Sequence, residues 1–265
     1  MNSLGLLLPE AFTPGTVGAL TTALRADGWR VQEIRPQARA MDPTRLLPAH
    51  DLYLLLSSSP LALAMAGVLT ARGAMVLNPH PAVIRARDPI VRTTVLAAAA
   101  LPVPPSWTTG QGAALAPLVT AGPLRVEPHP TADGADVAEL RDPAAARAYG
   151  AIRDRFGLPV PLVATRTMTR AIGRFWLEVV GGVVLPPFIG RPGPAAGLAV
   201  AATAALGLLF AGVGFAETAG RLVITGVDPV PLVVGGADLG AALAGLVRRR
   251  AGRLAPPTPA YEEVG

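Results

Sequence analysis

Few side chains in this 265-residue chain are of types that commonly do chemistry. Cysteine is absent, and the three histidines, His50, His80 and His129, lie far apart without the spacing of metal ligands. Neither disulfides nor metal sites built on thiolate or imidazole are therefore expected. One carboxylate is notable, because Asp228 ends the apolar run in RLVITGVDPVP, directly before Pro229. Its side chain either serves a site at the end of a strand or caps the turn before the proline.

The charge of the chain is basic but dispersed. All 23 basic residues are arginines, and with 18 acidic residues the formal net charge is +5. Only the run at positions 248, 249, 250 and 253 is dense, and aromatic residues make up 5% of the chain. A nucleic-acid surface normally combines a basic patch with interleaved aromatics, so we interpret the run as the solvated last turn of a helix. We expect no nucleic-acid partner. The alternative function is binding of nucleic acid or of an anionic membrane through this run, and the affinity of such binding would fall steeply with salt.

The hydrophobic content is 51%, which predicts a folded chain with a sizeable core. The start, MNSLGLLLPEAF, lacks the basic residues of a signal peptide, and together with the missing cysteines this favours the cytoplasm. Residues 195–216 are uncharged over a length that would span a bilayer. They are rich in alanine and glycine, so we interpret them as a buried helix at 195–206 and a buried strand at 208–215. A membrane span is the alternative, and no membrane partner is expected.

The first part of the chain alternates between strand and helix patterns. Such alternation predicts βαβ units and a parallel sheet. The strands are expected at residues 4–8, 29–34, 51–56 and 74–77, and the helices at residues 16–27 and 61–72.

The pattern changes after Pro81, where strands no longer alternate regularly with helices. LPVPPSWTTG is interpreted as a proline-rich connector, and Gly181-Gly182 as the turn of a two-residue hairpin. The helices are expected at residues 88–100, 142–156, 195–206 and 237–250, and the strands at 123–128, 136–140, 160–164, 175–180, 183–185, 208–215 and 221–227.

Several stretches, taken in order, resemble ATP-grasp ligases, in particular the glutamate-adding ligases and their glutathione-synthetase-like relatives. The order of strand, serine-rich turn, helix, strand, Asn-Pro and helix begins at DLYLLLSSSP and is followed by PLRVEPHPTADGADV, EVVGGVV, LGLLFAGVGFA and VITGVDPVP. The resemblance runs from about residue 51 to 250. It implies an α/β fold that is α+β in its C-terminal half: a parallel βαβ domain at 1–84, ATP-grasp-like subdomains at 85–165 and 166–254, and a tail at 255–265.

The resemblance assigns magnesium to the end of the closing strand. Asp228 takes the place of the asparagine in the family's Glu-x-Asn. The glutamate position is Gly226, and the partner aspartate on the preceding strand is Gly214. A hard dication needs oxygen ligands from two or three converging side chains, so the resemblance implies only a weak metal site at Asp228.

The phosphate-binding side departs from the family in charge. The lysine on the strand ending in PLRVEPH is replaced by Glu127, and a carboxylate repels a phosphate by about 4 kcal/mol at 4 Å and an effective dielectric of 20. A second lysine is replaced by Pro89 or Ile90. Arg125 and Arg92 are the candidates to stand in, although Arg125 shares a strand face with Glu127 and can simply pair with it.

Three further regions bear on nucleotide binding. The phosphate loop keeps one glycine, Gly134, within an acidic TADG. The linker that clasps adenine in the family, LVATRTM, carries Thr165 and Thr167 in place of the usual acidic and aliphatic pair. Trp176 stands where a substrate-binding or phosphate-binding arginine would stand.

These departures lead us to expect a catalytically degenerate ATP-grasp-like protein without a cofactor, which binds a protein partner such as an active ligase or a second copy. The alternative is an active ligase that joins a carboxylate to an amine with ATP and magnesium at a non-standard site. Its metal ligands would be Asp228 and Glu217, and its phosphate-binding residues Arg92, Arg125 or Arg174. Glu217 can instead form only a cross-strand pair with Arg221.

Overall fold

The structure, a computed structural model, describes residues 2–10, 14–38, 40–128, 137–155, 161–168, 173–186, 193–218, 220–231 and 236–252. The chain forms two compact units. Unit 1 comprises Met1–His80, Leu185–Pro187 and Val230–Gly265, and unit 2 comprises Pro81–Val184 and Phe188–Pro229. The expected tail, and Gly134 with its loop, lie outside the described residues.

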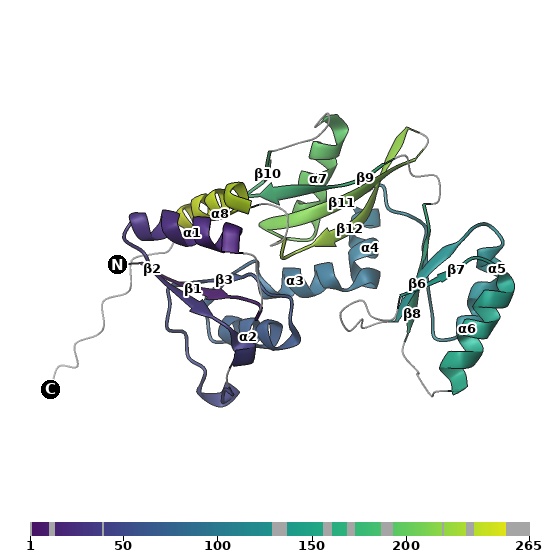
Figure 1. The fold of residues 1–265 in the computed structure, drawn as a ribbon, viewed down its shortest axis with the longest axis horizontal. Coiled ribbons are helices and arrows are strands. Elements are labelled where there is room, and N and C mark those ends of the chain that lie inside the picture. Colours follow the sequence, from purple (N-terminus) through teal and green to yellow (C-terminus); the bar gives the residue numbers. More distant parts are fainter. Residues whose placement is uncertain are drawn as a thin grey trace. The chain divides into compact units, whose positions relative to one another are not determined.

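Unit 1 is built on a four-stranded parallel sheet with the strand order β2-β1-β3-β4. Figure 1 labels the first three of these strands, β2, β1 and β3. β1 and β3 are buried along their whole length, as strands are when helices cover both faces of a parallel sheet. The expected alternation of strands and helices is therefore confirmed. The strands are β1 (Ser3–Leu7), β2 (Arg30–Ile34), β3 (Leu52–Leu55) and β4 (Met75–Leu77), and the helices are α1 (Pro14–Ala26), α2 (Pro60–Ala71) and α8 (Gly236–Ala251).

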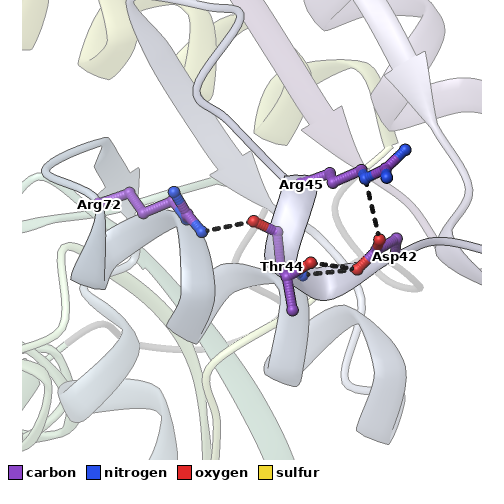
Figure 2. Close-up of polar contacts among 4 residues, drawn as sticks. All are labelled: Asp42, Thr44, Arg45 and Arg72. Carbon is purple, nitrogen blue, oxygen red and sulfur yellow. Dashed lines mark hydrogen bonds and ion pairs between the residues drawn. The ribbon is translucent and has the colours of Figure 1, made fainter.

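A short polar turn ties the connection after β2 to the end of α2. This connection contains the 3₁₀ turns η1 (Pro36–Ala38) and η2 (Pro43–Arg45). Asp42 caps η2 by accepting hydrogen bonds from the backbone N–H of Thr44 at 2.9 Å and from its hydroxyl at 2.6 Å, and these bonds lower the pKa of Asp42. Arg45 pairs with the same carboxylate at 3.3 Å, and Arg72 donates to the Thr44 carbonyl at 2.8 Å (Figure 2).

Helix α8 packs on α1, at the other end of the sequence. Gly240 makes this contact close: a Cβ there would lie 2.4 Å from the Thr16 carbonyl oxygen and 2.8 Å from the Ala19 Cβ. The subdomain expected at residues 166–254 includes this helix. The periodicity of the helix predicts its apolar face but not its packing partner, which is in unit 1.

Unit 2 contains an antiparallel sheet with the strand order β5-β8-β6-β7. Its core includes Leu124, Val126, Leu162 and Ala164 from the central strands β6 and β8, and Ala146 from α6. β5 lies within the stretch interpreted as a proline-rich connector, so that interpretation was incomplete, and α3 (His80–Arg87) was not expected either. The elements are β5 (Ser106–Thr109), η3 (Gly112–Leu115), α5 (Ala116–Val119), β6 (Leu124–Pro128), β7 (Ala138–Leu140), α6 (Pro143–Arg155) and β8 (Leu162–Arg166).

The second sheet of unit 2 is also antiparallel, in the order β10-β9-β11-β12. Gly181 and Gly182 both have positive φ, 61° and 84°, as a two-residue hairpin turn requires, which confirms that expectation. Residues 195–216 divide into helix α7 and strand β11 as expected, and no helix among the described residues is long and apolar enough to cross a membrane. The elements are α4 (Pro89–Ala98), β9 (Gly173–Val180), β10 (Val183–Val184), α7 (Gly193–Ala205), β11 (Phe210–Thr218) and β12 (Arg221–Asp228).

Candidate functional site

Unit 2 contains a cavity of about 240 Å³ between β6, the end of β8 with the linker that follows it, and the first half of β9. The structure therefore brings Arg125 together with Trp176, which lies 51 positions further along the chain. Arg166 also lines the cavity, whereas Glu127 and Asp228 do not. Its polar and aromatic walls come from Arg125, Thr165, Arg166, Thr167, Arg174 and Trp176.

Trp176 lies across two glycines on the neighbouring strands. Gly214 is paired with Trp176 on one side and with Gly226 on the other, so the three residues form one row on one face of the sheet. A Cβ at Gly214 would lie 2.9, 3.0 and 3.1 Å from three atoms of the indole six-membered ring. A Cβ at Gly226 would lie 3.4 Å from the same ring. The indole therefore fills the space that a side chain at Gly214 would need, and it borders the space beside Gly226.

The next row on the same face contains two carboxylates. Glu178 and Asp228 are each paired with Gly212, on β9 and β12, and residues directly opposite across an antiparallel pair share a face. Two strand spacings separate their backbones by about 10 Å. The described residues contain no group of three or more side chains suited to a metal ion.

Glu178 was not identified from the sequence. It lies two residues after Trp176, hence on the same strand face, and it is the one acidic residue in the apolar run FWLEVV. Burial raises the pKa of Glu178 to about 7. No described residue makes a hydrogen bond to its buried Oε1 atom. The sequence does contain a signal for Glu178: it is an acidic residue in an apolar strand, on the same strand face as Trp176.

The residues expected to bind phosphate form a cluster in which positive and negative side chains interact with one another. Arg125 pairs with Glu127 at 3.7 Å, as the shared strand face suggested, and the Glu127 side chain is 20% exposed against 61% for Arg125. Burial lowers the pKa of Arg92, while the nearby charges of Glu127 and Asp88 raise it and Arg125 lowers it further. Glu127 thus interacts electrostatically with both predicted arginines.

Arg166 lines the cavity but is not marked by any motif in the sequence. Its guanidinium donates hydrogen bonds to the carbonyl of Leu118, at 3.0 Å, and to that of Gly122. It also lies over the Trp107 ring, 5.1 Å from the ring centre. These partners are neutral, so they fix the position of the guanidinium without neutralising its positive charge.

The linker after β8 holds the two predicted threonines. The Thr165 hydroxyl accepts a hydrogen bond from the Ser106 hydroxyl at 3.3 Å. The backbone N–H of Thr167 donates to the Pro123 carbonyl at 3.0 Å, so this N–H already has a partner. The buried Thr167 hydroxyl, in contrast, meets no hydrogen-bond partner among the described residues.

Glu217 does not join Asp228. Glu217 is paired with Leu222 and Gly173, and it lies five residues along β11 from Gly212, which is opposite Asp228. That separation amounts to about 17 Å and an odd number of residues, which places the two carboxylates on opposite faces. Arg221 is opposite Thr218 rather than Glu217. The structure thus separates the two residues that the alternative hypothesis used as metal ligands.

Solved structures with the same fold include several ligases. The chain is similar to the RimK domain protein ATP-grasp from Sphaerobacter thermophilus DSM 20745, with a TM-score of 0.77 and 20% identity over 93% of this chain and 99% of that one. D-cycloserine synthetase DcsG gives a TM-score of 0.70 and 19% identity over 92% and 99%. The ATP-grasp ligase PsnB, complexed with minimal precursor, Mg and ADP, gives 0.68 and 16% over 95% and 98%.

No protein-family model and no curated protein matches the amino-acid sequence. The likeness is therefore one of structure, and it covers nearly the whole length of this chain and of each of those proteins. The parallel sheet of unit 1 and the two antiparallel sheets of unit 2 account for it. The chain has the ATP-grasp fold.

Proposed function

We propose that this protein acts by binding, as a partner of another enzyme, and does not perform ligation with ATP and magnesium. The observation that carries the proposal is the row formed by Trp176, Gly214 and Gly226. In the resemblance, two of these positions supply magnesium ligands. Here they carry no side-chain oxygen, and an indole occupies the space above Gly214 and borders Gly226. A hard dication prefers oxygen ligands, so the residues present do not fit a magnesium ion at this place.

The charges on the phosphate side support the same conclusion. Phosphoryl transfer depends on positive groups that neutralise charge as it develops. Glu127 brings a negative charge to the position of a lysine, and Arg125 and Arg92 both interact with that charge. Glu127 thereby offsets part of the positive charge that these arginines would present to a phosphate group.

The experiment is a calorimetric titration of the purified chain with ATP, in magnesium and separately in EDTA. We expect no gain in affinity from magnesium, and no difference between the native chain and an Asp228→Asn variant. A tenfold or greater gain in affinity with magnesium, lost in Asp228→Asn, would overturn the proposal.

The partner is the second part of the proposal. We expect the tagged chain, isolated from the cells that make it, to retain an enzyme whose rate changes when the chain is removed and is restored when it is added back. The absence of any such effect on the retained enzyme would contradict this part and leave the first part standing.

The competing hypothesis is an active ligase that joins a carboxylate to an amine at a non-standard site. Its support is the placement of Glu178 and Asp228 on one face of the sheet with only Gly212 between them. The titration separates the two hypotheses, because the ligase requires magnesium-dependent ATP binding and ATP turnover when carboxylates and amines are supplied.

A further inference from the structure

Unit 1 contains a cavity of its own, which is called the unit 1 cavity below. Its volume is about 390 Å³, and it lies between the outer strand β2, the connection that follows β2, the start of β3, and α2. None of the residues considered above for nucleotide or magnesium binding lines it. Sites for small molecules usually have volumes of roughly 300–1,000 Å³, so the unit 1 cavity is large enough for such a ligand.

Two aromatic rings form one wall of the unit 1 cavity, because Gly5 leaves room for them. Gly5 on β1 is paired with Tyr53 on β3. A Cβ at Gly5 would lie 2.7 Å from the Tyr53 ring and 2.9 Å from Cδ2 of His50, so both rings lie against the backbone there. The rings meet edge to face, with their centres 5.4 Å apart. The Tyr53 hydroxyl accepts a hydrogen bond from the Ala49 backbone N–H at 2.8 Å, which fixes the position of this wall.

The remaining lining is largely apolar. Met41, Leu46 and Leu47 line the cavity from the connection after β2, whose η2 turn is held by the polar contacts in Figure 2. Ile34 and Met65 line it from β2 and α2, and thioethers such as that of Met65 make favourable contacts with aromatic rings. Leu47 is 65% exposed. A ligand that covers this leucine would remove apolar surface from water, which favours binding.

The charges at the unit 1 cavity are already compensated. Among the described residues that line it, Asp42 and Arg45 are charged, and they pair with one another at 3.3 Å. Burial lowers the pKa of His50, and the nearby charge of Arg30 lowers it further, while Asp51 raises it. The imidazole is therefore neutral at pH 7. A charged ligand would lose hydration here without gaining an unpaired opposite charge, so the cavity favours an uncharged ligand.

His50 is also the group that favours a particular polar substituent on the ligand. No described residue makes a hydrogen bond to its buried Nδ1 atom, so the hydrogen-bonding capacity of the ring is not used up within the described residues. A neutral imidazole has one donor nitrogen and one acceptor nitrogen. A hydroxyl group both donates and accepts, so it matches either nitrogen in either tautomer.

We propose that the unit 1 cavity binds a small, uncharged aromatic molecule with a hydroxyl group, whose ring packs on Met65 and Leu47 and whose hydroxyl forms a hydrogen bond with His50. Phenols and naphthols have this chemistry. The inference goes beyond the proposed function and does not rest on it, because the cavity is lined by residues 32–65 of unit 1.

The test is equilibrium dialysis of the full chain at pH 7 against matched probes, without ATP or magnesium. 2-Naphthol carries the ring and the hydroxyl, naphthalene lacks the hydroxyl, and 2-naphthoate carries a negative charge in its place. We expect saturable binding of one 2-naphthol per chain, and binding at least about tenfold weaker for 2-naphthoate. Naphthalene should bind about 2- to 12-fold more weakly than 2-naphthol, as expected for the loss of one hydrogen bond.

Variants separate binding in the cavity from adsorption to exposed apolar surface. Leu47→Ser changes an exposed residue and should keep the fold, and we expect it to weaken the binding of both 2-naphthol and naphthalene at least about threefold. Leu61→Ser is the matched control, because Leu61 is also an exposed leucine of unit 1, at 43%, and does not line the cavity. His50→Phe keeps an aromatic ring and should weaken 2-naphthol about 2- to 12-fold while leaving naphthalene unchanged.

Four results would overturn the inference: no saturable binding of 2-naphthol, equal binding of 2-naphthoate, equal effects of Leu47→Ser and Leu61→Ser, or equal effects of His50→Phe on 2-naphthol and naphthalene. Circular dichroism establishes that each variant is folded, and the exposed position of Leu47 keeps the test valid if His50→Phe does not fold. None of these results involves ATP or magnesium. Magnesium-dependent ATP binding would instead overturn the proposed function, so the two failures are distinguishable.

Discussion

Trp176 and Gly214 are directly opposed on β9 and β11, and the indole ring lies where a side chain at Gly214 would begin. The two residues are therefore coupled sterically. The glycine provides the space for the ring, and the ring prevents the carboxylate that the resemblance expects at this position.

Gly214→Ala should destabilise the protein because its Cβ would lie 2.9 Å from the indole. We expect a loss of about 1–3 kcal/mol in the free energy of unfolding, typical of overpacking, measured by urea denaturation. The loss should largely disappear in a Trp176→Ala background. Gly173→Ala, where a Cβ would meet nothing within 4 Å, is the control. An equal loss with and without Trp176 would show that the two residues are not coupled.

Glu178 should make the stability of the protein depend on pH. Burial raises its pKa to about 7 from 4.5, so between these values the folded state binds more protons than the unfolded state. Stability should therefore fall as the pH rises from about 4.5 to 7 and then level off. We expect Glu178→Gln to gain stability relative to the native chain over the same interval, measured as the difference in Tm. A difference that stays constant with pH would contradict this assignment.

Gly240→Ala should weaken the contact between α1 and α8, because a Cβ would lie 2.4 Å from the Thr16 carbonyl oxygen. We expect a loss of at least about 1–3 kcal/mol in the free energy of unfolding. Gly245→Ala in the same helix is the matched control, since its nearest atom is the flexible end of Arg249 at 3.4 Å. Alanine there should stabilise the helix by up to about 1 kcal/mol. Equal effects at both positions would show that the close approach at Gly240 is not limiting.

Arg248 should contribute little to stability and should do so only at low salt. It pairs with Asp27 through two nitrogens, and the two side chains are 46% and 42% exposed. Exposed ion pairs contribute about 0.2–1 kcal/mol and are screened by salt. We expect Arg248→Gln to lower the free energy of unfolding within that range in low salt and to match the native chain in 1 M salt. A loss that persists in 1 M salt would indicate a role beyond the ion pair.

Much of the fold follows from local patterns in the sequence. The alternation of apolar runs with helical spacing predicts the parallel sheet of unit 1, and Gly181-Gly182 predicts the hairpin that joins β9 and β10. β5 was missed because four residues, Ser106 to Thr109, follow a run of prolines and are only partly buried, so they show no apolar alternation. Local patterns also cannot show that α8 returns to α1, since that contact joins distant parts of the chain.

The candidate site is predicted less completely than the fold. The landmarks of the resemblance lead to Arg125, Thr165, Thr167 and Trp176, which all line the cavity. The relation of Glu178 to Asp228 depends on strand register. The pairing of β11 with β12 shifts between Gly214 and Phe215, and a shift of one residue moves every later side chain to the other face. The spacing of residues in the sequence carries no sign of this irregularity.

The packing of α8 on α1 also determines the order in which the two units can be completed during translation. Unit 1 needs both its first helix and residues 236–251 near the other end of the described chain, whereas the two antiparallel sheets of unit 2 lie within residues 106–228. A chain emerging from the ribosome can therefore complete both sheets of unit 2 while α1 still exposes the surface that α8 later covers. Translation must therefore pass residue 251 before that apolar surface is covered.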